Sequence, residues 1–157
     1  METLPHHYAV TASASESGDT ATGARGLPEL RVAAPAEFGG PGDRWSPETL
    51  LVAAVANCFI LTFRAVAGAA HLPWTALVCH AHGTLDSIER VMQFTRVDLQ
   101  VLLTLPQGVD PVRARRALER AERGCLVSRS LNAPVTLTAD VQCAGTAVAV
   151  SPDVVSV

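Results

Sequence analysis

The sequence predicts a single α+β domain, and three of its features predict this class. The chain has 157 residues, of which 48% are hydrophobic, enough for one domain with a buried core. Strand-like stretches lie on both sides of a long apolar helix, and a second helix precedes the last strand. The resulting order, β-β-α-β-β-α-β, is typical of an α+β domain. We expect it to span residues 1–157, with its core at about 8–142 and a loosely attached tail at 144–157.

Two short strands are expected before the long helix. Tyr8–Ala14 alternates weakly, and Leu27–Ala34 follows a Leu-Pro pair. Between them, Ser15–Gly26 is small, polar and rich in Ser, Thr and Gly, which favours a turn or mobile loop. Pro35–Arg44 is rich in glycine and is expected to be the loop that leads into the helix.

The long helix is expected at Ser46–His71. Ser46 can cap it, Pro47 suits the first helical position, and Glu48 places a negative charge near the positive helix end. The stretch is apolar almost all round, which indicates burial. At roughly 1.5 Å per residue the helix is about 39 Å long, more than one small domain usually buries. We therefore expect a second copy of the chain to cover part of it, as in an intertwined homodimer.

Two more strands and their connection are expected after this helix. Trp74–Leu85 places alternate side chains on opposite sides, with Cys79 on one side and His80 and His82 on the other. Phe94–Leu105 alternates strongly. The short polar connection between the two runs predicts an antiparallel hairpin.

A second helix and a last strand complete the predicted domain. Asp110 followed by proline is a typical helix start. One apolar stripe then recurs at helical spacing, and the remaining positions are charged, typical of a solvated face. The stripe consists of Ala114, Leu118, Ala121 and Cys125. Val135–Val141 alternates as a last strand.

Charge and composition exclude several classes of function. The formal net charge is −3 and no basic run is present, which argues against nucleic acid or an anionic membrane surface as a partner. Asn57 and Arg64 interrupt the apolar helix, which disfavours a membrane span. His80 and His82 are too few ligands for a metal, and no cysteines form a Cys-x-x-Cys pair, so we expect no metal or other cofactor. The polar N-terminus lacks the pattern of a signal peptide, and we expect a reducing, cytoplasmic location.

Four cysteines remain to be explained. A cysteine in a core is most often a small apolar residue, and this interpretation suits Cys79 and Cys143, which lie in strand-like stretches. Cys58 and Cys125 differ because each lies on a predicted helix next to polar residues. If the helices pack together, the two thiols could meet as a nucleophile and a resolving partner. Peroxide reduction requires such a pair, together with a nearby cation that lowers the pKa of the nucleophile and holds the peroxide.

The sequence around these cysteines resembles a known family. The helix contains Ser-Pro-Glu-Thr-Leu-Leu at Ser46–Leu51, followed by Val-Ala-Ala-Val-Ala-Asn-Cys-Phe at Val52–Phe59. Further matching stretches are Glu37–Gly40, Phe94–Arg96 and Arg120–Ser128. Together they resemble the OsmC/Ohr family of osmotically inducible and organic-hydroperoxide-resistance proteins. The resemblance extends over most of the chain, and its two cysteine contexts make it specific.

The resemblance implies an OsmC-like fold and a homodimeric thiol peroxidase. Cys58 matches the peroxidatic cysteine of the family, and Cys125 matches its resolving cysteine. In this interpretation Cys58 reduces an organic hydroperoxide and becomes a sulfenic acid. The sulfenic acid condenses with Cys125 into a disulfide, which an external dithiol reduces.

Glu48 matches the family's carboxylate that orients a catalytic arginine. Arg25, Arg31 and Arg44 are the candidates for that arginine, and Arg25 is the first choice because its glycine-containing loop can fold over the helix. Burial alone would raise the pKa of Cys58, so we expect a cation to lower it. Glu48 and Cys58 lie about 15 Å apart along one helix. The carboxylate must therefore act through an arginine that spans the gap, or on the thiol of a neighbouring subunit.

Two rival interpretations stay open. One is a catalytically silent thiol sensor or ligand-binding dimer of the same fold. The other is a structural dimer whose cysteines belong only to the core. A missing arginine near Cys58 would favour both rivals, and consumption of alkyl hydroperoxide with added dithiol would favour the peroxidase.

Overall fold

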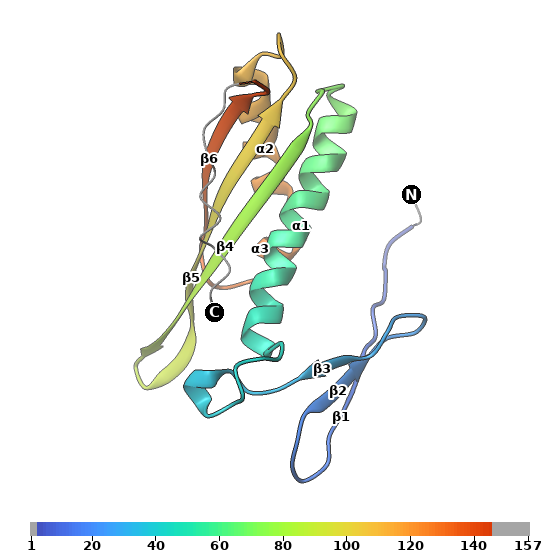
Figure 1. Cartoon of the computed structure of the whole chain (residues 1–157), viewed down its shortest axis with the longest axis vertical. Coiled ribbons are helices and arrows are strands. Elements are labelled where there is room, and N and C mark those ends of the chain that lie inside the picture. The colour runs from blue at the N-terminus through green and yellow to red at the C-terminus, as the bar shows by residue number, and fades with distance from the viewer. Residues whose placement is uncertain (1–2, 146–157) are drawn as a thin grey trace. The chain divides into compact units, whose positions relative to one another are not determined.

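The computed structural model describes residues 3–145 and divides into two compact units. The N-terminal unit ends at Leu50, the C-terminal unit begins at Leu51, and each is described by itself. The elements are β1 (Thr11–Ser13), β2 (Thr20–Gly23), β3 (Leu30–Val32), the 3₁₀ helix η1 (Ala36–Phe38), α1 (Pro47–Ala69), β4 (Ala76–Ile88), β5 (Val91–Leu105), α2 (Pro111–Gly124), α3 (Leu126–Arg129) and β6 (Val135–Cys143) (Figure 1). The predicted α+β class is confirmed. Most of the predicted tail, residues 146–157, lies outside the described residues.

The N-terminal unit contains a small antiparallel sheet in the order β1-β2-β3. Its central strand, β2, corrects one prediction, because Ser15–Gly26 was expected to form only a turn or loop. Thr20 and Thr22 pair with Val32 and Leu30 on β3. Threonine favours strands, and this preference outweighs the small polar residues around it.

A glycine-dependent turn leads from this sheet to α1, as the sequence predicts. Gly39 has a φ of 80°, and the Gly40 N–H donates to the Pro35 carbonyl at 3.0 Å. A Cβ on Gly40 would lie 1.6 Å from the Ala34 carbonyl oxygen. Only glycine can occupy that position without moving the backbone.

Both ends of α1 carry recognisable caps. The Thr49 N–H donates to Ser46 Oγ at 3.1 Å, and the Ser46 N–H donates to Thr49 Oγ1 at 2.9 Å, which is a reciprocal capping box. At the other end His71 has a φ of 46°, and the Leu72 N–H donates to the Ala67 carbonyl at 2.9 Å, as in a Schellman motif. The predicted bounds of the helix are therefore confirmed to within two residues.

Only one face of α1 is buried in this chain. The fully buried side chains recur every four residues and are Val55, Phe59, Phe63 and Ala67. Leu61 on another face is 57% exposed. By length and composition α1 could cross a membrane, but core helices of soluble proteins have the same properties, so this is weak evidence.

The C-terminal unit is built on a sheet in the order β4-β5-β6. The predicted hairpin of β4 and β5 is confirmed, and its strands run on to a two-residue turn at Glu89 and Arg90, whose φ angles are 51° and 68°. β6 pairs in parallel with β5, but only from Val97 onward, so the hairpin extends beyond it (Figure 1).

Helices α1 and α2 cover the same face of this sheet. Alternate residues of β5 are buried in one cluster with the buried stripes of both helices. Asp110 caps α2 as predicted, because its Oδ1 accepts from the Val112 N–H at 2.9 Å. The predicted stripe of α2 is also confirmed, since all four of its residues are buried. This packing brings the end of α2 close to the middle of α1, where a Cβ on Gly124 would lie 3.3 Å from Thr62 Cγ2.

Candidate active site

Cys58 lies on α1 and is half-buried. Cys58 precedes Phe59, which belongs to the buried stripe of the helix. Thr62 follows Cys58 by one helical turn. The Val127 N–H from α3 donates to Cys58 Sγ at an N···S distance of 3.5 Å. The side chain of Cys58 therefore faces the segment that follows the second cysteine.

Cys125 lies at the joint between α2 and α3 and is fully buried. Its backbone is extended, with φ −67° and ψ 112°, and this ends α2 and turns the chain into α3. The turn is held by two backbone hydrogen bonds, from the Cys125 N–H to the Glu122 carbonyl at 3.2 Å and from the Arg129 N–H to the Cys125 carbonyl at 3.1 Å. Cys125 and Cys58 are free thiols, and they are near enough for each to change the pKa of the other. The structure thus brings together the two cysteines that the sequence singled out.

The pKa of Cys58 is lowered from its ordinary value. Burial is the largest influence and raises this pKa, but several donors to the thiolate together outweigh it. The donors are the Val127 N–H, the Cys125 thiol, the Thr62 side chain and the Leu126 N–H. From the sequence we expected only a cation in this role. The backbone donors could not be predicted, because residue identity gives no sign of where an N–H group points.

The other two thiols of this core behave differently. Burial and, to a smaller extent, the charge of the neighbouring Cys125 raise the pKa of Cys79 to about 11. Burial also raises the pKa of Cys125, while the side chain and N–H of Ser128 act in the opposite direction. Cys58 is therefore the thiol in this group whose pKa is lowered, as a nucleophile requires.

Glu48 and the candidate arginines belong to the N-terminal unit, so their roles toward Cys58 stay predictions. Glu48 lines a cavity of about 530 Å³ in that unit, and its Oε2 is buried without a hydrogen-bond partner among the described residues. Arg31 pairs with Glu29 at 3.4 Å. Arg44 pairs with Asp19 at 3.1 Å and with Asp43. Arg25 is exposed and forms no ion pair within residues 3–145.

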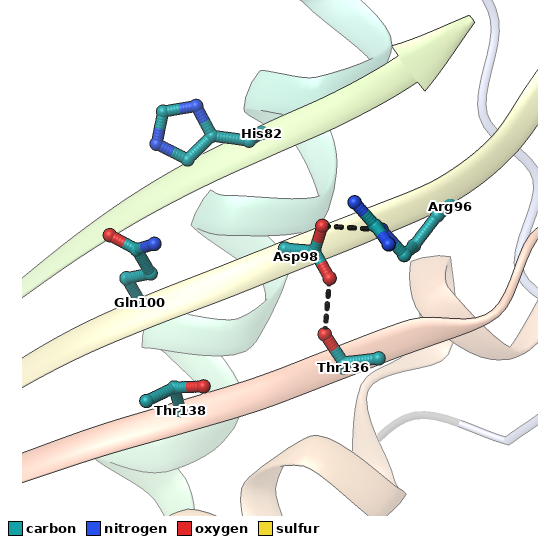
Figure 2. Close-up of a pocket in the computed structure, with 6 residues that line it drawn as sticks. All are labelled: His82, Arg96, Asp98, Gln100, Thr136 and Thr138. Carbon is teal, nitrogen blue, oxygen red and sulfur yellow. Dashed lines mark hydrogen bonds and ion pairs between the residues drawn. The ribbon is translucent and has the colours of Figure 1, made fainter. Parts of the chain in front are cut away.

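A second cavity of about 440 Å³ lies on the outer face of the C-terminal sheet, and Figure 2 shows its lining. It is lined by His82, Arg96, Asp98, Gln100, Thr136 and Thr138. Asp98 accepts from Thr136 Oγ1 at 2.5 Å and pairs with Arg96 Nε at 2.6 Å, and both contacts lower the pKa of its carboxyl group. Asp98 and Arg96 pair with each other, and the thiol pair lies on the side of the sheet that the helices cover. This cavity is therefore separate from the candidate active site. Within residues 3–145 no group of three or more metal-binding side chains occurs, here or elsewhere.

The comparisons with known proteins agree with this architecture. The family model described as OsmC-like protein matches residues 40–140. The uncharacterized protein YmaD of Bacillus subtilis is 25% identical over 84% of this chain and 91% of its own length. The peroxiredoxin OsmC of Escherichia coli is 30% identical over 59% of this chain and 64% of its own length.

Solved structures show the same fold. An OsmC-like protein of unknown function from Vibrio cholerae has a TM-score of 0.80 at 15% identity, covering 87% of this chain and all of that one. An organic hydroperoxide resistance protein from Elizabethkingia anophelis, with thiocyanate bound, has a TM-score of 0.71 at 23% identity, covering 91% of this chain and 99% of that one. The predicted resemblance is confirmed by the family match over more than half of the sequence, and this chain belongs to the OsmC-like protein family.

Proposed function

We propose that this protein is a thiol peroxidase that reduces organic hydroperoxides to alcohols. Membership of the family supports a peroxiredoxin-like function in general terms. The observation that carries the specific proposal is the position of Cys58 beside Cys125: Cys58 Sγ accepts from the N–H of Val127, two residues after Cys125, and the pKa of Cys58 is lowered there. A lowered pKa supplies a thiolate for attack, and an adjacent second thiol can trap the product.

The reaction follows from this pair of thiols. The Cys58 thiolate attacks the distal oxygen of the hydroperoxide, the O–O bond breaks, and the alkoxide leaves as the alcohol after taking up a proton. Cys58 is then a sulfenic acid. Cys125 attacks its sulfur, a disulfide forms, and hydroxide leaves as water. An external dithiol reduces the disulfide and returns both thiols.

Organic hydroperoxides are the proposed substrate class because the surroundings of Cys58 are largely apolar. Phe59 and Ile60 follow it on α1, and Leu126 at the start of α3 is 75% exposed beside the thiol pair. Such surfaces favour an alkyl group over water next to the peroxide. The proposed chemistry needs no metal or other cofactor.

We further propose that the protein acts as a homodimer. The apolar α1 buries only one face in this chain, and within residues 3–50 Val32 is the only buried hydrophobic side chain. A second copy would cover this apolar surface. The dimer would also bring a guanidinium to the unpaired Oε2 of Glu48, with Arg25 as the proposed catalytic arginine. A cytoplasmic location, where dithiol reductants are present, is part of the same proposal.

The experiment is consumption of an alkyl hydroperoxide by the purified protein with a dithiol present. Cys58→Ser should abolish turnover, whereas Cys125→Ser should still oxidise once at Cys58. Cys79→Ala is the matched control and should keep activity, because the high pKa of Cys79 makes it a poor nucleophile. Equal consumption by wild type and Cys58→Ser would refute the proposal.

One observation favours a second candidate, the silent thiol sensor. Arg31 and Arg44 are both paired with carboxylates of their own unit, which leaves fewer arginines for Cys58. A sensor would form the Cys58–Cys125 disulfide once and would not turn over with added dithiol. The same assay distinguishes the two functions, because only the peroxidase consumes many equivalents of peroxide per chain.

A further inference from the structure

Ser128 on α3 has a buried hydroxyl group that takes no part in the reaction steps described above. Its Oγ is inaccessible to solvent and has no hydrogen-bond partner within the described residues. A buried hydroxyl without such a partner is unfavourable, so its presence calls for an explanation. The neighbouring Ser130 differs, because its exposed Oγ donates to the Leu126 carbonyl at 2.9 Å.

The position of Ser128 places its hydroxyl near the Cys125 thiol. It lies three residues after Cys125, so one helical turn places both on the same side of α3. The residue before it, Val127, donates its N–H to Cys58 Sγ at 3.5 Å. Both the N–H and the hydroxyl of Ser128 are close enough to the Cys125 thiol to lower its pKa. Val127 therefore contacts the Cys58 sulfur, and the next residue, Ser128, lies close to the Cys125 sulfur.

We propose that Ser128 is a positioning residue for the resolving step, whose hydroxyl is unpaired beside the Cys125 thiol and donates to the Cys125 sulfur when it becomes a thiolate. This inference rests on the proposed peroxidase function. In that step the Cys125 thiolate attacks the Cys58 sulfenic acid, the S–S bond forms, the S–O bond breaks, and the proton lost by Cys125 leaves with hydroxide as water. No further oxidant or reductant is required.

The resolving thiol needs this donor because its surroundings oppose its negative charge. Cys125 is fully buried, and burial raises its pKa. The titratable groups near it are Cys58 on α1 and Cys79 on β4, and a thiolate at either would repel its charge. A hydroxyl that is unpaired in the thiol state can donate to the thiolate at little cost, because it gives up no other hydrogen bond.

The test is the rate of disulfide formation in Ser128→Ala, with Ser130→Ala as the matched control from the same turn. After one equivalent of alkyl hydroperoxide, a dimedone-type probe measures the Cys58 sulfenic acid and peptide mapping measures the disulfide. Ser128→Ala should form the sulfenic acid at the wild-type rate. This variant should convert the sulfenic acid to the disulfide about tenfold more slowly than wild type, and the pH profile of that rate should shift to higher pH. Excess peroxide should then convert Cys58 to the sulfinic acid.

Two control variants accompany this test. Ser130→Ala should behave as wild type, and Ser128→Thr, which keeps a hydroxyl group, should restore the wild-type rate of disulfide formation.

The outcomes separate this inference from the proposed function. If wild-type Cys58 forms no sulfenic acid, the peroxidase proposal fails and the role of Ser128 fails with it. If the sulfenic acid forms but Ser128→Ala resolves it at the wild-type rate and pH profile, the inference about Ser128 alone is overturned. A purely structural role would instead lower the melting temperature of Ser128→Ala and leave the pH profile unchanged, which also contradicts the proposal.

Discussion

The two units of this chain differ sharply in how much of their surface they bury. The C-terminal unit packs α1, α2 and three strands around one cluster, in which Phe59, Phe63 and Leu103 are fully buried. The N-terminal unit has three strands of three or four residues. Within residues 3–50, Val32 and Ser46 are the only buried side chains. Isolated small sheets of this kind are marginally stable. We therefore infer that the N-terminal unit depends more than the C-terminal unit on contacts outside itself for its stability.

The same division applies to the proposed chemistry. The thiol pair and the donors that lower the pKa of Cys58 all lie in the C-terminal unit. Glu48 and the candidate arginines lie in the N-terminal unit. The C-terminal unit thus contains a thiol whose pKa is lowered, and in the proposed function the cation comes from an arginine of the N-terminal unit.

The largest expected difference comes from truncating one leucine in each unit. Leu103→Ala should lower the free energy of unfolding by about 2–5 kcal/mol, because Leu103 is fully buried and truncation leaves a cavity. Leu27→Ala should cost less than about 0.5 kcal/mol, because Leu27 is 68% exposed. Denaturant unfolding of both variants at one protein concentration measures the difference. Equal losses would mean that the N-terminal unit is as well packed as the other in the assembled protein.

A pair of glycines should give a smaller contrast of the same sign. A Cβ on Gly83 would lie 2.6 Å from Val52 Cγ2 and 2.7 Å from Phe94 Cε1, so Gly83→Ala should cost about 1–3 kcal/mol by overpacking. Gly23 on β2 has no atom within 4 Å of such a Cβ, and Gly23→Ala should be neutral or slightly stabilising. Thermal unfolding measures both. Val52→Ala combined with Gly83→Ala should recover part of the loss, and no recovery would locate the strain elsewhere.

The pH dependence of thiol alkylation compares what the two units contribute to Cys58. The thiolate is the reactive form and is populated above the pKa, so Cys58 should react at lower pH than Cys79, whose pKa is about 11. Thr62→Val removes a donor within the C-terminal unit and should raise the pKa of Cys58, which slows alkylation near neutral pH. Arg25→Ala should slow it about tenfold, equivalent to roughly 1.4 kcal/mol, if this arginine supplies the cation.

Arg31→Ala and Arg44→Ala are the matched controls for Arg25→Ala, because both arginines already pair with carboxylates. Wild-type rates in all three arginine variants would mean that the C-terminal unit activates Cys58 without the N-terminal unit. That result would remove Arg25 from the proposed site and leave the thiol pair unchanged.

The smallest expected effect concerns Asp98 on the outer face of the C-terminal sheet. Hydrogen bonding to Thr136 and the charge of Arg96 lower the pKa of Asp98 in the folded protein. Its contribution to stability is therefore present above the unfolded pKa and is lost as the pH falls through the folded pKa. Asp98→Asn should slightly weaken stability at neutral pH and flatten its loss in acid, as urea unfolding at several pH values would measure. An unchanged acid profile would mean that these exposed contacts contribute nothing measurable.

The sequence predicted the well-packed unit better than the other. The strict alternation of Phe94–Leu105 and the four-residue stripe that ends at Cys125 specify which side chains are buried, and the structure confirms both. The weakly patterned Ser15–Gly26 hid strand β2, because a short strand with little burial leaves no hydrophobic period. The family resemblance identified the two cysteines. It did not identify Ser128 or the backbone donors of Leu126 and Val127, since their contribution depends on how α3 turns.

Cys58 and Cys125 are proposed to form one redox pair within a chain. The most direct measurement is peptide mapping of the protein after one equivalent of an alkyl hydroperoxide, with the thiols then blocked by an alkylating reagent. We predict one intrachain disulfide, Cys58–Cys125, with Cys79 and Cys143 recovered as alkylated thiols. A disulfide from Cys58 to Cys79 or Cys143, or recovery of Cys58 unoxidised, would rule out this redox pair.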